Sequence, residues 1–133
     1  MPYLNVKLSV PESAQTNAGI AAVLTDLTAD VLGKRRELTA VEIEYVPPQR
    51  WFIGGTSLHE QGARSFRLDI KVTEGTNTKD EKSRYVAQVF AAIEAIIGPL
   101  APASYVVVHE VRADAWGYEG QTQESRYIRG KAL

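Results

Sequence analysis

Apolar and polar residues alternate along residues 3–8 and again along residues 67–72, with the period of a strand that is buried on one side. A different pattern follows each segment, because apolar residues recur at relative positions 0, 3, 4, 7 and 11, which share one face of an α-helix. These positions hold Ile20, Val23, Leu24, Leu27 and Val31 in the first segment, and Val86, Val89, Phe90, Ile93 and Ile97 in the second. The pattern therefore predicts a strand followed by a helix, twice.

Both predicted helices have recognisable ends. Gly33 follows the first helix and Gly98 the second, and glycine is favoured there because it adopts left-handed backbone angles at least cost. Thr78 and Glu81 have the spacing of a capping box, which predicts the start of the second helix. Each helix is followed by a run rich in β-branched residues, at 41–46 and 105–111, and then by a tryptophan and glycine turn, at 51–55 and 116–120.

The chain therefore contains an internal repeat. Leu4 and Leu68 are 64 residues apart, and Ile20 and Val86 are 66 apart. Each half reads as a βαβ unit, whose two strands should be parallel and joined by a right-handed crossover. The predicted fold class is α+β, with tandem βαβ units forming one four-stranded mixed sheet and both helices on one face. We expect one domain, 1–133, with repeats at 2–55 and 66–120, a connection at 56–65 and a C-terminal tail at 121–133.

The second face of this sheet carries a mixture of charged, aromatic and aliphatic side chains, among them Lys7, Glu44, Asp69 and Tyr105. Such a face is either solvated, as in many antiparallel sheets, or it lines the interior of a closed ring of subunits. The ring would also protect the edges of the sheet. The pattern leaves both interpretations open.

Composition argues against several classes of function. The formal net charge of −1 and the pI of about 6.1 give no electrostatic reason to expect a nucleic-acid partner. The chain has no cysteine, and its two histidines, His59 and His109, are 50 residues apart, so no metal site is predicted. No segment approaches the roughly twenty apolar residues that cross a bilayer. We expect a cytoplasmic protein without a membrane partner.

Pro2 is the strongest candidate for chemistry. Removal of Met1 would leave a secondary amine at the start of the first strand. A terminal amine titrates near pH 8, and burial disfavours its charged form. Pro2 could therefore accept and return protons near neutral pH, as a general base without a catalytic side chain.

These features together resemble the tautomerase superfamily. The resemblance rests on Pro2, on Gly33-Lys34 after the first helix, and on the turns at 51–55 and 116–120. The chain is similar to fused 4-oxalocrotonate tautomerases, which are related to macrophage migration inhibitory factor, malonate semialdehyde decarboxylase and cis-3-chloroacrylic acid dehalogenase. The resemblance implies a homotrimer that needs no cofactor. Because the position that matches Pro2 in the second half is about Phe66, it also implies one catalytic proline per chain.

The resemblance also implies roles for other residues. Lys34 would bind the substrate carboxylate, and Arg35 and Arg36 compete for the same role. Tyr105 falls where migration inhibitory factor has a pocket tyrosine from a neighbouring subunit, which would stabilise charge on a substrate oxygen. Trp116 would wall the pocket and exclude water. The alternative for each is structural: a solvated charge, a sheet aromatic, or a turn-packing aromatic.

The predicted reaction is keto-enol proton transfer on a small α-keto or enol carboxylate, with Pro2 as the base. In one alternative, protonated Pro2 acts as an acid in hydration, dehalogenation or decarboxylation. Relatives with that chemistry carry an arginine pair where this chain has residues 73–76, which argues against it. In the other alternative, the chain is a non-enzymatic trimeric scaffold or signalling protein that retains Met1. Arg126 and Arg129, in the tail, are expected to reach a neighbouring subunit.

Overall fold

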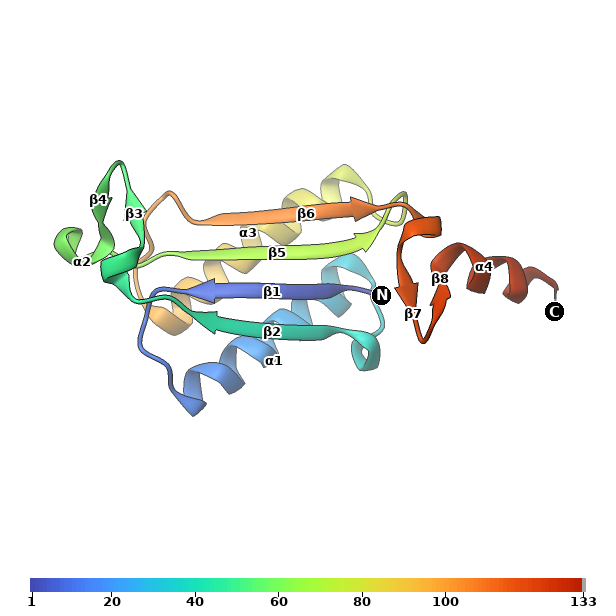
Figure 1. Cartoon of the computed structure of the whole chain (residues 1–133), viewed down its shortest axis with the longest axis horizontal. Coiled ribbons are helices and arrows are strands. Elements are labelled where there is room, and N and C mark those ends of the chain that lie inside the picture. The colour runs from blue at the N-terminus through green and yellow to red at the C-terminus, as the bar shows by residue number, and fades with distance from the viewer. Residues whose placement is uncertain (133) are drawn as a thin grey trace.

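The structure is a computed structural model that describes residues 1–132, with side chains to residue 128. Its principal elements, labelled in Figure 1, are β1 (Tyr3–Leu8), α1 (Ala14–Leu32), β2 (Ala40–Tyr45), β5 (Phe66–Thr73), α3 (Lys79–Ile97) and β6 (Tyr105–Val111). The shorter ones are β3 (Phe52–Ile53), β4 (Thr56–Ser57), α2 (Leu58–Gln61), β7 (Gly117–Tyr118), β8 (Gln121–Thr122) and α4 (Gln123–Ala132). Three 3₁₀ turns lie at Arg36–Leu38, Pro48–Arg50 and Ala113–Ala115.

The sheet confirms the predicted fold class. Its four strands lie in the order β2-β1-β5-β6, with β1 parallel to β2 and β5 parallel to β6. The two halves meet at the centre, where β1 and β5 are antiparallel and Tyr3 lies opposite Lys71. Both long helices cover the same face of the sheet (Figure 1). The expected βαβ order is therefore present in each half.

The core lies between the sheet and the two helices, as the alternation of apolar residues predicts. The inward side chains of β1 and β5 are fully buried, and α1 and α3 each contribute one buried stripe. The fully buried members are Leu4, Val6, Leu8, Phe66, Leu68 and Ile70 from the strands, and Ile20, Leu24, Tyr85, Val89 and Ile93 from the helices.

The buried stripe of α3 differs by one position from the prediction. Val86, expected in the core, is 39% exposed, whereas the neighbouring Tyr85 is fully buried. The Tyr85 hydroxyl can be buried because it shares a hydrogen bond of 2.8 Å with the Thr28 hydroxyl of α1. Burial raises the pKa of Tyr85 to about 12, and the hydrogen bond from Thr28 opposes this shift.

The two helix ends also differ from each other. Gly33 has the predicted left-handed angles, φ 68° and ψ 25°. Gly98 instead has φ 97° and ψ −179°, because the side chain of Arg64 caps this end by donating to the Ile97 carbonyl oxygen at 2.6 Å. This φ lies in the region that side chains other than glycine rarely adopt, and a β-carbon at Gly98 would also meet the end of the Arg64 side chain. The predicted capping box of Thr78 and Glu81 is confirmed.

Two small hairpins project from opposite ends of the sheet (Figure 1). The first, β3–β4, leads into α2, so the connection 56–65 contains structured elements and buries Leu58. The second, β7–β8, leads into α4, which forms most of the tail. The N-terminus lies beside β7 and β8 (Figure 1).

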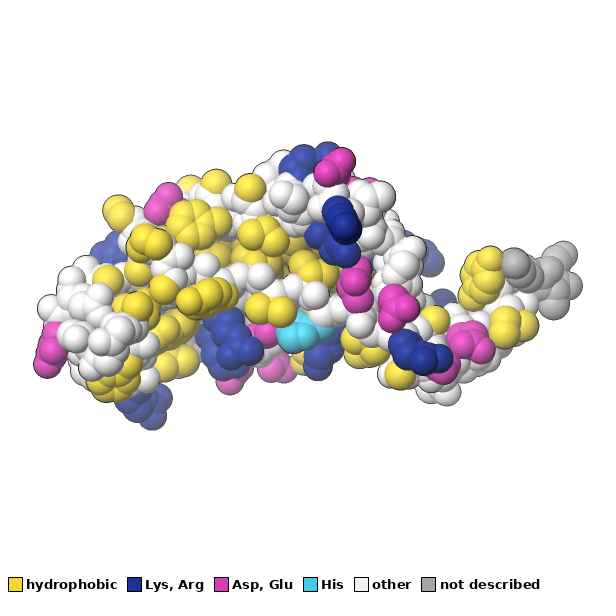
Figure 2. All heavy atoms as spheres, turned by 90° about the horizontal axis from the view of Figure 1, so that it is seen from above, with side chains coloured by type: hydrophobic (Ala, Val, Ile, Leu, Met, Phe, Trp, Pro, Cys, Tyr) yellow, Lys and Arg dark blue, Asp and Glu magenta, His cyan; other side chains and the backbone are white. Residues whose placement is uncertain are grey.

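The uncovered sheet face carries a cross-strand polar network. Glu42 accepts hydrogen bonds from Tyr3 and Asn5 at 2.8 and 3.0 Å. On the other half, Asp69 contacts His109 at 2.7 Å. Figure 2, seen from above the view of Figure 1, shows a histidine among basic and acidic side chains on this side of the molecule. None of the helices within residues 1–132 has the length and apolar character to cross a membrane.

The buried hydroxyl pair gives a test of helix packing. We expect Tyr85→Phe and Thr28→Val each to lower the free energy of unfolding by about 1–3 kcal/mol, because each leaves a buried hydroxyl without its partner. The double variant should cost less than the sum of the two, since neither hydroxyl then remains. Urea unfolding of the four proteins measures the coupling, and strictly additive losses would contradict it.

The same pair predicts a dependence on alkaline pH. Between about pH 10 and 12 the unfolded chain loses the Tyr85 proton while the folded chain keeps it, so the stability from this residue is complete below pH 10 and decreases as the pH rises. In Tyr85→Phe this contribution to the alkaline loss of stability should be absent, as urea unfolding between about pH 9 and 12 would measure.

Candidate active site

The start of β1 forms one wall of the candidate site. Pro2 is buried, and its carbonyl oxygen accepts a hydrogen bond from the Ala40 amide at 3.3 Å, which ties the N-terminus to the start of β2. Since β1 and β2 are parallel, both strands begin at the same end of the sheet. Pro2 is therefore held in place by the sheet itself.

Lys34 reaches the same place from the end of α1. The left-handed Gly33 ends the helix, and the Lys34 amide then donates to the Thr28 carbonyl oxygen at 3.3 Å. This turn directs the chain back toward Pro2. The two residues line a pocket of about 260 Å³, whose lining consists of Met1, Pro2, Gly33, Lys34, Arg35, Leu38, Gln123 and Arg126.

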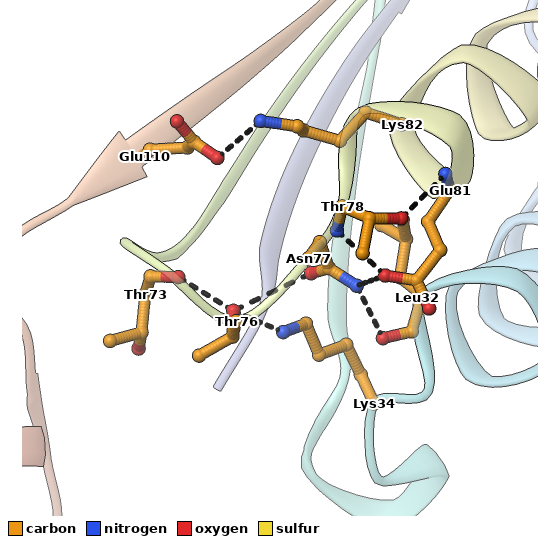
Figure 3. A network of polar contacts seen from close by, with 9 residues as sticks. All are labelled: Leu32, Lys34, Thr73, Thr76, Asn77, Thr78, Glu81, Lys82 and Glu110. Carbon is orange, nitrogen blue, oxygen red and sulfur yellow. Dashed lines mark hydrogen bonds and ion pairs between the residues drawn. The ribbon is translucent and has the colours of Figure 1, made fainter.

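The second half of the chain fixes the Lys34 side chain. Lys34 Nζ donates to Thr76 Oγ1 at 2.7 Å, and Thr76 in turn donates to the Thr73 carbonyl oxygen at 2.6 Å. Asn77 Nδ2 donates to the Leu32 carbonyl oxygen at 2.8 Å, so the β5–α3 loop also holds the end of α1 (Figure 3). The ammonium group is thus positioned by a loop that lies about forty residues further along the sequence.

The pocket is electropositive. None of its lining residues is acidic, whereas Lys34, Arg35 and Arg126 are basic. Burial, followed by the positive charges of Lys34 and Arg126, lowers the pKa of the terminal amine of Met1. Burial also lowers the pKa of Lys34, and the negative charge of Glu81 partly opposes this. An amine at this position therefore loses its proton more readily than an exposed one.

Trp116 lies against the N-terminus. Its indole Nε1 donates a hydrogen bond of 2.7 Å to the Met1 carbonyl oxygen. This carbonyl group is bonded directly to the Pro2 nitrogen. This contact brings the β7–β8 hairpin to the N-terminus. The structure thus places the Trp116 indole beside the Met1–Pro2 peptide bond, although Trp116 is not among the residues that line the pocket of about 260 Å³.

Tyr105 and Arg36 are not brought to this pocket. Tyr105 pairs with Arg67, which lies opposite Lys7 near the far end of β1, and it is 61% exposed. Tyr105 lines a different pocket, of about 520 Å³, with Arg50 and Phe52 among its neighbours.

Arg36 points to a different partner. Its guanidinium contacts Asp26 of α1 at 2.5 Å, and it is not part of the pocket lining. Arg35 does line the pocket, with its guanidinium 2.6 Å from Glu37. The 3₁₀ turn that begins at Arg36 directs these adjacent side chains to different surroundings.

Two residues of the pocket were not found from the sequence as parts of it. Gln123 and Arg126 lie on α4 and face the Pro2 pocket of their own chain, whereas Arg126 was expected to reach a neighbouring subunit. The side chain of Arg129 lies outside the described residues. The only signal in the sequence is the i, i+3 spacing of two polar residues, which is too common to identify a site. Within residues 1–132, no group of three or more His, Asp or Glu side chains could hold a metal ion.

The fold is shared with solved structures over nearly the full chain. A native fused 4-OT is similar with a TM-score of 0.83 and 22% identity, over 92% of this chain and 97% of that one. A fused 4-OT described as an asymmetric trimer gives a TM-score of 0.79 and 22% identity, over 93% and 98%. A macrophage migration inhibitory factor-like protein from Entamoeba histolytica gives 0.75 and 21%, over 91% and 97%.

Sequence comparisons identify the family. The model of the tautomerase enzyme family matches residues 2–61 and again residues 68–126. A probable tautomerase K2 from Dickeya dadantii (strain 3937) is 34% identical over 62 residues, which are 46% of this chain and 92% of that protein. The chain belongs to the tautomerase family, and these findings support an activity of the tautomerase type.

The Lys34–Thr76 contact predicts a measurable change at Lys34. In Thr76→Val the ammonium loses an acceptor that favours its charged form, so the pKa of Lys34 should fall further. The titration of Lys34, followed by NMR of labelled lysine side chains, measures this. Thr76→Ser keeps the hydroxyl and should titrate like the unaltered protein, whereas equal titration of all three proteins would contradict the contact.

Proposed function

We propose that this chain is a cofactor-independent tautomerase in which the Pro2 amine, freed by removal of Met1, is the general base. The observation that carries the proposal is that Pro2 lines a pocket in which burial, Lys34 and Arg126 lower the pKa of the adjacent Met1 amine, and the same surroundings would act on a Pro2 amine. A lowered pKa increases the fraction of neutral amine at pH 7, and only the neutral amine can accept a proton.

The proposed reaction moves one proton. The Pro2 nitrogen takes the proton from the enol oxygen of a small carboxylate, and the carbonyl forms there. The protonated Pro2 amine then returns the proton to the carbon at the other end of the former enol double bond. Lys34 provides positive charge for the substrate carboxylate, since Thr76 already orients its ammonium group. The same electrostatics disfavour the alternative in which Pro2 acts as an acid, because a lowered pKa reduces the protonated fraction at neutral pH.

We further propose that the working unit is a homotrimer in which Tyr105 of a neighbouring subunit completes the site. Tyr105 and Phe52 are 61% and 59% exposed, and the sheet ends in two open edge strands, β2 and β6. Subunit contacts would cover these groups, and the uncovered sheet face would then line the interior of the ring. A cytoplasmic location stays a prediction.

Replacement of the base tests the proposal. In Met1-free protein, Pro2→Ala should slow the ketonisation of phenylenolpyruvate or 2-hydroxymuconate by about 10²-fold or more, because the secondary amine is replaced by a primary amine in an altered position. Pro11→Ala is a matched control at an exposed proline and should be fully active. Intact-mass measurement establishes the removal of Met1. Undiminished activity of Pro2→Ala, or of protein that retains Met1, would refute Pro2 as the base, whereas natural protein that retains Met1 and is inactive would favour the scaffold alternative.

The pH dependence gives a second test. The Lys34 charge lowers the pKa of the Met1 amine and should do the same to a Pro2 amine. Lys34→Gln should therefore raise the pKa of Pro2 and move the acid limb of the kcat/KM profile to higher pH. Lys79→Gln removes the same charge from an exposed site at the start of α3 and should leave the limb in place. A limb that does not move in Lys34→Gln would show that another group titrates.

A further inference from the structure

Two side chains of α4 leave unused hydrogen-bond donors beside the Pro2 pocket. Gln123 and Arg126 are three residues apart, so they share one face of the helix. Gln123 Nε2 and Arg126 Nη1 are both buried, and neither has an acceptor within the described part of the chain. Buried donors in proteins are nearly always paired, so two together at one pocket point to a ligand that supplies the acceptors.

The helix that carries these donors, α4, contacts the β7–β8 hairpin. The Gln123 amide donates to the Trp116 carbonyl oxygen at 2.8 Å, which joins the start of α4 to the hairpin. The Arg126 guanidinium carbon lies 4.5 Å from the centre of the Tyr118 ring, so the aromatic face supports the cation. These contacts anchor the start of α4 and the Arg126 guanidinium beside the pocket.

Charge restricts the class of ligand. Arg126 lies on α4 and Lys34 in the turn after α1, and the positive charge of each lowers the pKa of the Met1 amine. Lys34 already donates to Thr76, whereas Arg126 Nη1 has no partner among the described residues. A guanidinium and an amide N–H offer separate donors to the two oxygens of a carboxylate, which is the anion that suits this pair.

Trp116 indicates where a second substrate oxygen would lie. The Met1 carbonyl oxygen that accepts its indole N–H belongs to the group attached to the Pro2 nitrogen, so it stands in for a substrate oxygen next to the base. Once Met1 is removed, this donor has lost that acceptor. Its position suits the oxygen on which charge develops during proton transfer.

We propose that Gln123 and Arg126 of α4 bind the substrate carboxylate, and that the Trp116 indole N–H donates to the substrate oxygen that reacts at Pro2. The C-terminal segment is then a binding element of the pocket. The identity of the ligand as a substrate rests on the proposed function, but the binding of a carboxylate can be measured without catalysis.

Calorimetric titration of Met1-free protein with cinnamate, and with neutral cinnamamide as the matched probe, tests the carboxylate site. Arg126→Gln should weaken cinnamate binding by about 10-fold or more while leaving cinnamamide unchanged, because a charge-assisted hydrogen bond is lost. Gln123→Leu should weaken cinnamate by about 3-fold to 10-fold. Arg126→Lys keeps the charge without the planar fork and should give an intermediate loss.

Arg112→Gln is the control, since Arg112 is an exposed arginine paired with Asp114 and should bind both probes like the unaltered protein. The inference is overturned if the unaltered protein binds no cinnamate, if Arg126→Gln binds it equally well, or if that variant loses both probes equally. Pro2→Ala should still bind cinnamate. Full activity of Pro2→Ala would refute the base while leaving the carboxylate site intact.

Steady-state kinetics tests the role of the Trp116 indole N–H. Trp116→Phe keeps an aromatic wall but removes the N–H, so it should lower kcat by about 10-fold with a smaller change in KM. Tyr45→Phe is the control, because it removes an aromatic hydrogen-bond donor that binds Asn17 and does not line the Pro2 pocket. A loss confined to KM would assign Trp116 to binding only and contradict the proposed contact with the reacting oxygen.

Discussion

The antiparallel pairing of β1 with β5 is the constraint on which the site depends. Because Tyr3 lies opposite Lys71, the beginning of the first strand is placed beside the end of the fifth. The loop after β5 then lies next to the N-terminus, and Thr76 can hold Lys34. A parallel pairing would place the start of β5 there, and the contacts between the two halves of the chain would be lost.

The two ends of the sheet show how a duplicated unit becomes asymmetric. At one end, Pro2 borders a pocket, and Gly33 turns Lys34 toward it. At the other end, the equivalent Phe66 is fully buried and carries no free amine. There the Arg64 guanidinium covers Gly98 and binds the Ile97 carbonyl oxygen, so the helix end is occupied by the protein's own cation. The first end instead leaves its cations, Lys34 and Arg126, around the pocket that Pro2 lines.

Taken by itself, the pocket lowers the stability of the folded chain. It buries an amine, a lysine and an arginine near one another, and it leaves two buried donors without acceptors in the described residues. The rest of the fold can carry this cost because the sheet and helices bury a continuous apolar core. An anionic ligand would relieve both the repulsion and the missing hydrogen bonds, which is a common physical signature of a binding site.

The sequence by itself determined the six principal elements, their order and two residues of the pocket, Pro2 and Lys34. Periodicity and end signals are local, so α1 and α3, the capping box at Thr78 and the inward residues of β1 follow from neighbouring residues alone. Pro2 and Lys34 could be predicted because each adjoins such an element.

Tertiary structure decided which other side chains face Pro2. Arg36 is turned to Asp26, Tyr105 lies toward the far end of the sheet, and Arg126 enters the pocket. These outcomes depend on strand register and on the packing of a polar helix, which are set by contacts between residues far apart in the chain and leave no local pattern.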